Sequence, residues 1–291
     1  MVKGRQTRQG LLEKISKSSM TKPLVLFLDF DEFAHPILET SKFLLTHVYQ
    51  ESKVILFHII EEALTTPAYV LPYLKFEFKK VEEELNKLIE SANFDREKVE
   101  KTLAFGERWA NLERFLHTLT PELLIIGYKP HLFKVPLAEK LLERLELTFL
   151  AVKEKPITNL KRILCFFDQS QDATFALKLA ANWAIKTGAK LTVLNFYFTK
   201  PLVGVNEITL HETIQTSITK TLQKELSEAD QILEDVLILK IDKIHDLHRM
   251  VNQGFEVIFM GRKGETLVQG LGSFSKHILR TSQVPVCVVK A

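Results

Sequence analysis

The sequence has few cysteines and no long apolar run. Its 2 cysteines in 291 residues are too few for a disulfide framework, and both Cys165 and Cys287 lie in apolar, strand-like runs that suit small buried hydrophobes. No run approaches the ~20 apolar residues that a membrane helix needs. The basic, polar segment 1–21 lacks the continuous apolar core of a secretory signal. We therefore expect a cytoplasmic protein that does not span a membrane.

A strong excess of charge of one sign is also missing. The formal net charge of +3 is too small to predict binding to nucleic acid or to an anionic membrane. Basic and acidic residues are interleaved along the expected helices, a pattern typical of solvated faces. What remains is an ordinary globular composition, 46% hydrophobic and 26% charged, over a length that suits one large or two moderate domains.

One pattern of strands and helices occurs twice in the chain. The apolar runs 24–29 and 163–168 both end in Asp, and continuous runs of this kind favour central strands of a parallel sheet. Further strands are expected in matching pairs, at 53–60 and 190–197, 99–105 and 236–241, 123–127 and 256–261, and 148–153 and 285–290. Corresponding landmarks lie 134 to 139 residues apart, which indicates a tandem duplication.

The repeat predicts an α/β fold of two tandem domains, each an open, five-stranded, Rossmann-like parallel sheet with helices on both faces. Long helices are expected at 75–91 and 210–232, between the second and third strands of each copy. A polar stretch with one proline, 154–159, separates the copies. We therefore predict a flexible basic segment at 1–21 and domains at 22–155 and 160–291.

The most informative stretch is 260–275, MGRKGETLVQGLGSFS, which follows a predicted strand and leads into a helix over 273–280. It holds four of the chain's 11 glycines, which permit positive φ and close approach of a ligand. Ser273 is placed to cap the helix, whose first N–H groups attract anions. The loop is suited to di- or triphosphate, with Ser273 and Ser275 as donors and Arg262 or Lys263 as counter-charge. A glycine-rich connection without a ligand explains the same spacing.

This stretch resembles the signature of the universal stress protein family, a strand ending in Gly, then x-x-Gly, nine residues, and Gly-Ser or Gly-Thr. Gly261-Arg-Lys-Gly264 and Gly272-Ser273 fit it, although only seven residues separate Gly264 from Gly272. The resemblance covers 22–291 as two copies. It implies a fold of the adenine nucleotide alpha hydrolase kind, with the copies joined as an intrachain pseudo-dimer through the last strands, 148–153 and 285–290.

The resemblance also implies an adenine-nucleotide site in the second copy. Asp168 corresponds to the family's ribose- or adenine-side acid, and Phe196 lies where the family places a side chain against adenine, so it either stacks on the base or fills the pocket. The implied ligand is ATP, with or without Mg. The candidate binding residues are Phe166, Asp168, Phe196, Met260, Gly261, Lys263, Gly264, Gly272, Ser273, Phe274 and Ser275. No catalytic or metal-ligating residue is assigned.

The first copy lacks the corresponding residues. Tyr128-Lys129-Pro130 follows Gly127, so the second glycine is missing, and Pro136-Leu137 stands where Gly-Ser is expected. Without those backbone donors a phosphate has little to hold it. We expect a structural or regulatory role for this copy.

Two other functions remain open from the sequence. One is a regulatory interaction module of the same fold that binds a protein partner or a second copy of itself but no nucleotide. The other is a phosphatase, because Asp29 and Asp31 follow a strand with the Asp-x-Asp spacing of haloacid dehalogenase-like enzymes. That chemistry needs more carboxylates for Mg²⁺, and the strand end at 127–130 offers none.

Two shorter motifs predict little. Residues 14–18, KISKS, look like a synthetase lysine-serine loop without its His-x-Gly-His partner, and a polar tail explains them. His245 and His248 have helical spacing but no fixed third ligand, which favours a solvated helix face over a metal site. No general base is evident, so we expect at most slow ATP hydrolysis.

Overall fold

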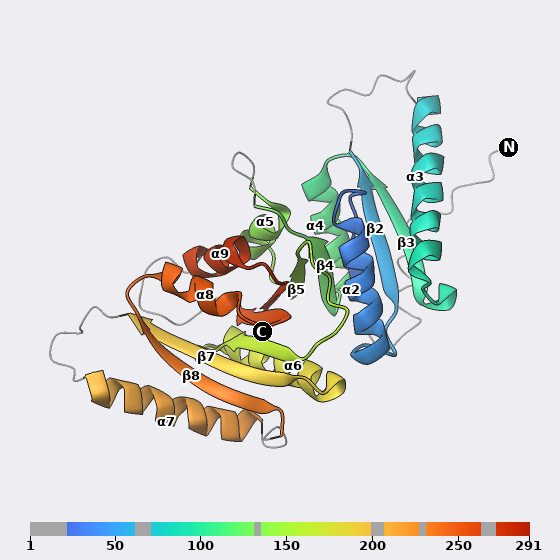
Figure 1. Ribbon diagram of the computed structural model, residues 1–291. Coiled ribbons are helices and arrows are strands. Elements are labelled where there is room, and N and C mark those ends of the chain that lie inside the picture. Colours follow the sequence, from blue (N-terminus) through green and yellow to red (C-terminus); the bar gives the residue numbers. More distant parts are fainter. Residues whose placement is uncertain (1–21, 62–70, 131–134, 199–206, 227–230, 263–271) are drawn as a thin grey trace. The chain divides into compact units, whose positions relative to one another are not determined.

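The structure is a computed structural model that describes residues 22–61, 71–130, 135–198, 207–226, 231–262 and 272–291. Strands and helices alternate in the same order in two copies (Figure 1). The first copy holds β1 (Leu24–Phe27), α2 (Ala34–His47), β2 (Val54–Ile60), α3 (Leu71–Ala92), η2 (Arg96–Lys98), β3 (Val99–Phe105), α4 (Arg108–Leu119), β4 (Leu123–Gly127), α5 (Leu137–Arg144) and β5 (Phe149–Val152). The second holds β6 (Arg162–Phe166), α6 (Gln171–Thr187), β7 (Lys190–Phe198), α7 (Glu207–Glu225), β8 (Leu233–Ile241), η3 (Ile244–Leu247), α8 (His248–Val251), β9 (Val257–Gly261), α9 (Gly272–Thr281) and β10 (Val286–Val289). The predicted α/β repeat is therefore confirmed.

The chain forms two compact units whose border runs through β4. The first unit consists of the described parts of Met1–Asp29 and Glu51–Leu124. Its strands lie in the order β3-β2-β1 and are parallel, with Leu24 opposite Val54 and Val54 opposite Val99. Beneath the sheet the rings of Phe57 and Phe115 stack at 4.0 Å. The domain borders predicted at 22–155 and 160–291 remain predictions.

The second unit consists of Phe30–Gln50 and Ile125–Ala291. Its strands follow the order β5-β10-β9-β6-β7-β8, and every pair from β10 to β8 is parallel. The exception is β5, which pairs antiparallel with β10 and places Leu150 opposite Cys287. The last strands of the two copies thus pair within one chain, as predicted, and each covers the edge of the other.

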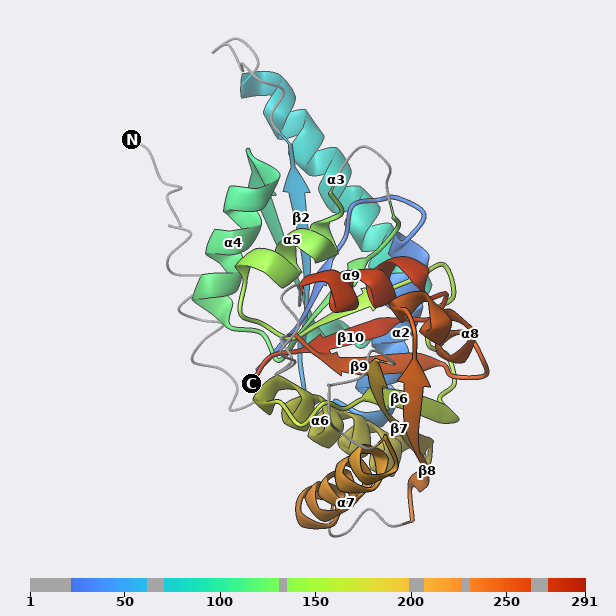
Figure 2. The same ribbon diagram turned by 90° about the vertical axis from the view of Figure 1, so that its left-hand side faces the viewer.

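Helices cover both faces of the sheet in the second unit. α6 and α7 lie on one face, and α8 and α9 lie on the other (Figure 2). The inner strands β6, β9 and β10 are almost wholly buried, which explains their continuous apolar sequence, whereas the edge strand β8 is mostly half-buried or exposed. Trp183 of α6 packs edge-on against Phe259 of β9 at 5.0 Å, and its Nε1 donates to the Tyr49 hydroxyl at 3.2 Å. Cys165 and Cys287 are free thiols in this core, and burial raises the pKa of both.

One predicted helix is shorter than expected. The helical pattern at 210–232 predicts a helix to Ile232, but α7 ends at Glu225. The carbonyl of Ile232 instead accepts a hydrogen bond from the Leu191 amide at 2.8 Å, because the chain is already entering the sheet at β8. Within the described parts of the chain, no helix is both long and apolar enough to cross a membrane.

Candidate functional site

An aromatic cluster lies where β6 and β7 of the second copy end. Phe166 is the last residue of β6, Phe196 is near the end of β7, and Phe274 is in the first turn of α9. The Phe274 ring lies 5.1 Å from that of Phe166 and 5.0 Å from that of Phe196, and Phe196 also contacts Phe198 at 5.9 Å. Three of the predicted binding residues are therefore brought together, and they contact one another.

Asp168 lies in the turn between β6 and α6. Its Oδ1 accepts a hydrogen bond from the Ser170 amide at 3.1 Å, and the Ser170 hydroxyl caps α6 by accepting from the Ala173 amide. Gln169 between them has a φ of 69°, a strained value for a residue with a side chain. Such turns hold a carboxylate at a fixed position at the end of a strand. Asp168 thus stabilises this turn, and a ligand that binds its carboxylate would do so beside the Ser170 amide.

Gly261, the last residue of β9, is required by packing. A Cβ at this position would lie 2.6 Å from the Ala173 amide nitrogen and 2.9 Å from the Asp172 carbonyl carbon, both in the first turn of α6. A Cβ added at its repeat equivalent, Gly127, would lie 2.5 Å from the Cβ of Phe33. Both copies therefore need glycine here whether or not a ligand binds.

The other predicted residues lie on β9, on α9 or outside the described parts of the chain. Met260 is buried within β9, and Ser275 is buried in α9. Gly272 and Ser273 begin α9, whose first turn offers amide donors, while Lys263 and Gly264 lie outside the described residues. Arg262 is buried and pairs with Glu146 at 3.4 Å, which leaves Lys263 as the predicted counter-charge for phosphate.

Both copies share one polar contact that was not predicted from the sequence. Asn195 of β7 donates from Nδ2 to the Phe167 carbonyl at 2.7 Å, and His58 of β2 donates from Nδ1 to the Leu28 carbonyl at 2.6 Å. In each copy the contact fixes the backbone just before the aspartate that follows the first strand. The sequence feature that could have predicted this contact is a polar residue, Asn195 or His58, inside a mainly apolar strand.

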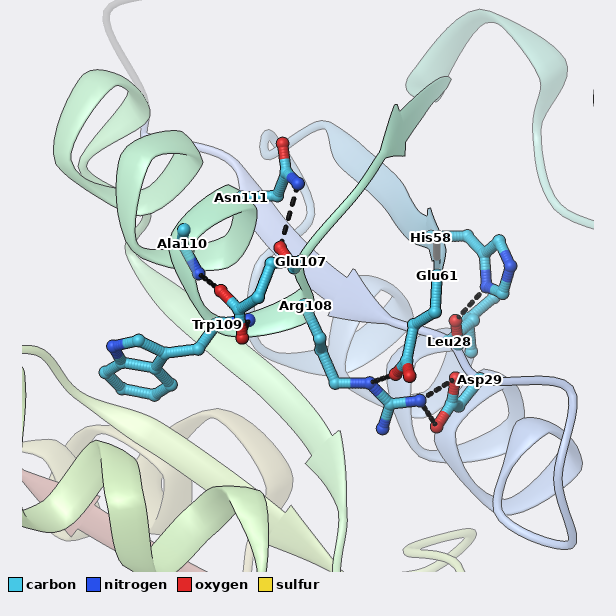
Figure 3. A network of polar contacts seen from close by, with 9 residues as sticks. All are labelled: Leu28, Asp29, His58, Glu61, Glu107, Arg108, Trp109, Ala110 and Asn111. Carbon is cyan, nitrogen blue, oxygen red and sulfur yellow. Dashed lines mark hydrogen bonds and ion pairs between the residues drawn. The ribbon is translucent and has the colours of Figure 1, made fainter. Parts of the chain in front are cut away.

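The first copy carries an ion-pair network instead of an aromatic cluster (Figure 3). Arg108, the first residue of α4, contacts both oxygens of Asp29 at 2.9 and 2.7 Å and also pairs with Glu61. Its guanidinium lies 5.9 Å from the centre of the Phe27 ring. The carboxylate equivalent to Asp168 is thus held by a protein cation in the first copy.

The network also bears on the phosphatase hypothesis. The carboxylate of Asp29 is engaged by Arg108, and Asp31 Oδ1 accepts from the Phe33 amide at 2.9 Å at the start of α2. Among the described residues, no group of three or more His, Cys, Asp or Glu side chains is arranged to hold a metal ion. These contacts favour a structural role for the Asp-x-Asp motif.

The histidines near α8 and α9 form a small cluster. His245 and His248 stack at 5.9 Å, and the pKa of His277 is lowered by burial and by these two neighbours. His245 and His248 are both exposed, as expected for a solvated face.

The family profile described as "Universal stress protein family" matches residues 159–290. This segment is a universal stress protein domain. It contains all the predicted binding residues and the whole second copy. No curated protein matches the chain.

Solved structures extend the likeness to the first copy. A universal stress protein from Archaeoglobus fulgidus DSM 4304 is 17% identical, with a TM-score of 0.67, and the match covers 93% of this chain and 97% of that one. A functionally unknown protein from Pseudomonas aeruginosa PAO1 is 16% identical, with a TM-score of 0.62, over 93% of both chains. At such identities the likeness concerns the fold alone, and both copies have the fold of universal stress proteins.

Proposed function

We propose that the universal stress protein domain binds ATP or a related adenine nucleotide, and that occupancy regulates the protein in a stress response. The observation that carries this proposal is the family match, because it covers the segment that holds Asp168, Phe196 and the first turn of α9. A carboxylate, an aromatic face and helix N–H donors suit ribose, base and phosphate respectively.

In this proposal Asp168 accepts hydrogen bonds from the ribose and Phe196 contacts the base. The backbone around Gly261, Gly264 and Gly272 holds the phosphates, with Lys263 as counter-charge. The hydroxyls of Ser273 and Ser275 reach the terminal phosphates, and any Mg²⁺ arrives with the nucleotide. The cytoplasmic location and at most slow hydrolysis are part of the same proposal.

The aromatic cluster favours a second candidate. Phe166, Phe196 and Phe274 contact one another where the base would lie, so they can fill the pocket and leave an interaction module that binds no nucleotide. Adenine entry requires Phe196 to separate from Phe274. The two candidates therefore differ in what happens when Phe196 is shortened.

Titration with ATP–Mg tests the proposal. At a free concentration of ten times Kd, the nucleotide should raise the free energy of unfolding by about 1.4 kcal/mol, which is measurable as a higher unfolding midpoint. We expect Asp168→Ala to weaken binding at least tenfold. The matched control Asp29→Ala removes the equivalent carboxylate of the first copy and should leave Kd unchanged.

The Phe196→Ala variant separates the candidates. Binding by the wild type that weakens in Phe196→Ala supports the stacking role. No binding by the wild type together with binding by Phe196→Ala supports the closed pocket. Equal loss of affinity in Asp29→Ala and Asp168→Ala would contradict a site in the second copy.

A further inference from the structure

The packing of α5 against α9 brings together oppositely charged residues at equivalent positions of the two copies. The last strands set the correspondence, because the same 137 residues separate Lys153 from Lys290, Glu139 from Lys276 and Glu143 from Arg280. α5 and α9 lie side by side in both views (Figures 1 and 2). The first copy therefore presents two acids where the second presents two bases.

The four residues form two reciprocal pairs. Arg280 donates from Nε and Nη2 to the two oxygens of Glu139, at 2.9 and 2.7 Å, and Lys276 pairs with Glu143. The first position of each helix thus contacts the second position of the other helix. This is the contact pattern of a two-fold interface, in which residue i meets j and j meets i.

The Glu139 pair is the stronger of the two. Its carboxylate is 1% exposed and also accepts from the Tyr128 hydroxyl at 2.8 Å. Burial alone raises the pKa of Glu139, but the bonds from Arg280 and Tyr128 outweigh it and lower this pKa. The carboxylate of Glu139 is buried while the side chain of its bidentate partner Arg280 is about half exposed, so removing the charge of Arg280 would leave a buried carboxylate without its cation.

We infer that these four positions make the two copies pair only with each other. Two second copies joined through β10 would place Lys276 against Arg280 twice, and two first copies joined through β5 would place Glu139 against Glu143 twice. Like charges at such short range disfavour both. The surface formed by α9 and β10 therefore fits the first copy and rejects a second copy of itself.

Charge reversal in the intact chain tests the pairing. Glu139→Arg with Glu143→Lys should lower the urea midpoint, and so should Lys276→Glu with Arg280→Glu. Combining all four substitutions restores opposite charges. We therefore expect the unfolding equilibrium constant of the quadruple variant to be at least about tenfold smaller than additive effects of the two double variants would give. Additive losses would overturn the inference.

Specificity is tested after the folded chain is cut at a protease site placed between Glu154 and Lys155, which are both exposed. Native mass spectrometry of cut wild type should show only unlike halves paired. The Lys276→Glu variant makes the second copy self-complementary, because the new carboxylate of one copy would meet Arg280 of the other, so pairs of second copies should appear. The control Lys276→Gln should give none. Like pairs in the wild type, or identical behaviour of Lys276→Glu and Lys276→Gln, would overturn the inference.

Discussion

Replacing Gly261 with Ala should lower the free energy of unfolding by about 3 kcal/mol, at the upper end of the usual range for an overpacked site. The added Cβ meets the backbone of Asp172 and Ala173 rather than the end of a flexible side chain. The first turn of α6 must therefore move away from β9, and the Ser170 cap moves with it. Urea or thermal unfolding of the purified variant measures the loss.

Gly188 provides the control at the other end of α6. It has a φ of 73°, and nothing lies within 4 Å of an added Cβ. Gly188→Ala therefore introduces only left-handed backbone strain of about 1 kcal/mol. If Gly261→Ala is no more destabilising than Gly188→Ala, the helix yields easily and the packing argument for Gly261 is wrong.

Lys153 should make the stability of the protein depend on pH. Its side chain is buried, its Nζ donates to the Leu279 carbonyl, and it lies 3.8 Å from the centre of the Tyr128 ring. Burial lowers the pKa of Lys153 from 10.5 to about 7, while the charge of Glu139 acts in the opposite direction. The folded protein therefore releases this proton at a lower pH than the unfolded chain does.

The sign of the effect follows from proton linkage. Between pH 7 and 10.5 the unfolded chain keeps a proton on Lys153 that the folded state has lost. The contribution of Lys153 to the free energy of unfolding therefore rises with pH. Below pH 7 both states are protonated and the full penalty of burying the charge remains. We expect Lys153→Met to be at least as stable as the wild type at pH 6.5, and its advantage to shrink by about 2 kcal/mol at pH 9.

The difference between wild type and variant isolates Lys153, because other groups titrate in both proteins. Lys290 is the matched control, since it is the equivalent lysine of the second copy but keeps contact with water beside Asp172. The Lys290→Met variant therefore measures what the loss of an equivalent but partly exposed lysine does to stability. Parallel pH profiles for wild type and Lys153→Met would show that Lys153 keeps its ordinary pKa.

The sequence predicted the repeat and its strands because buried parallel strands are continuous apolar runs that few other structures produce. The pairing of 148–153 with 285–290 came from the family resemblance and is confirmed by the antiparallel pairing of β5 with β10. The end of α7 was wrong because helical periodicity continues into residues that the sheet recruits. Local sequence patterns thus predicted which helices and strands form better than they predicted the residues at which these elements end.

Side-chain partners were much harder to predict. Interleaved charges suggested solvated helix faces, yet Glu139 is buried by a partner 141 residues away. Arg108 and Asp29 are 79 residues apart and share no motif. For the candidate site, the sequence analysis included Phe166, Phe196 and Phe274 among the candidates, but it did not predict that their rings would contact one another. Such contacts depend on how the chain brings distant segments together, which no short pattern records.

The opposite charges on α5 and α9 also constrain how such a chain can evolve. A fresh duplication begins with identical halves, which are interchangeable and each able to pair with its own kind. Once one half holds Glu139 and Glu143 and the other holds Lys276 and Arg280, neither half can replace the other. Loss of either half then leaves the survivor with an uncovered strand edge. The first half is thereby retained even if it never binds a ligand of its own.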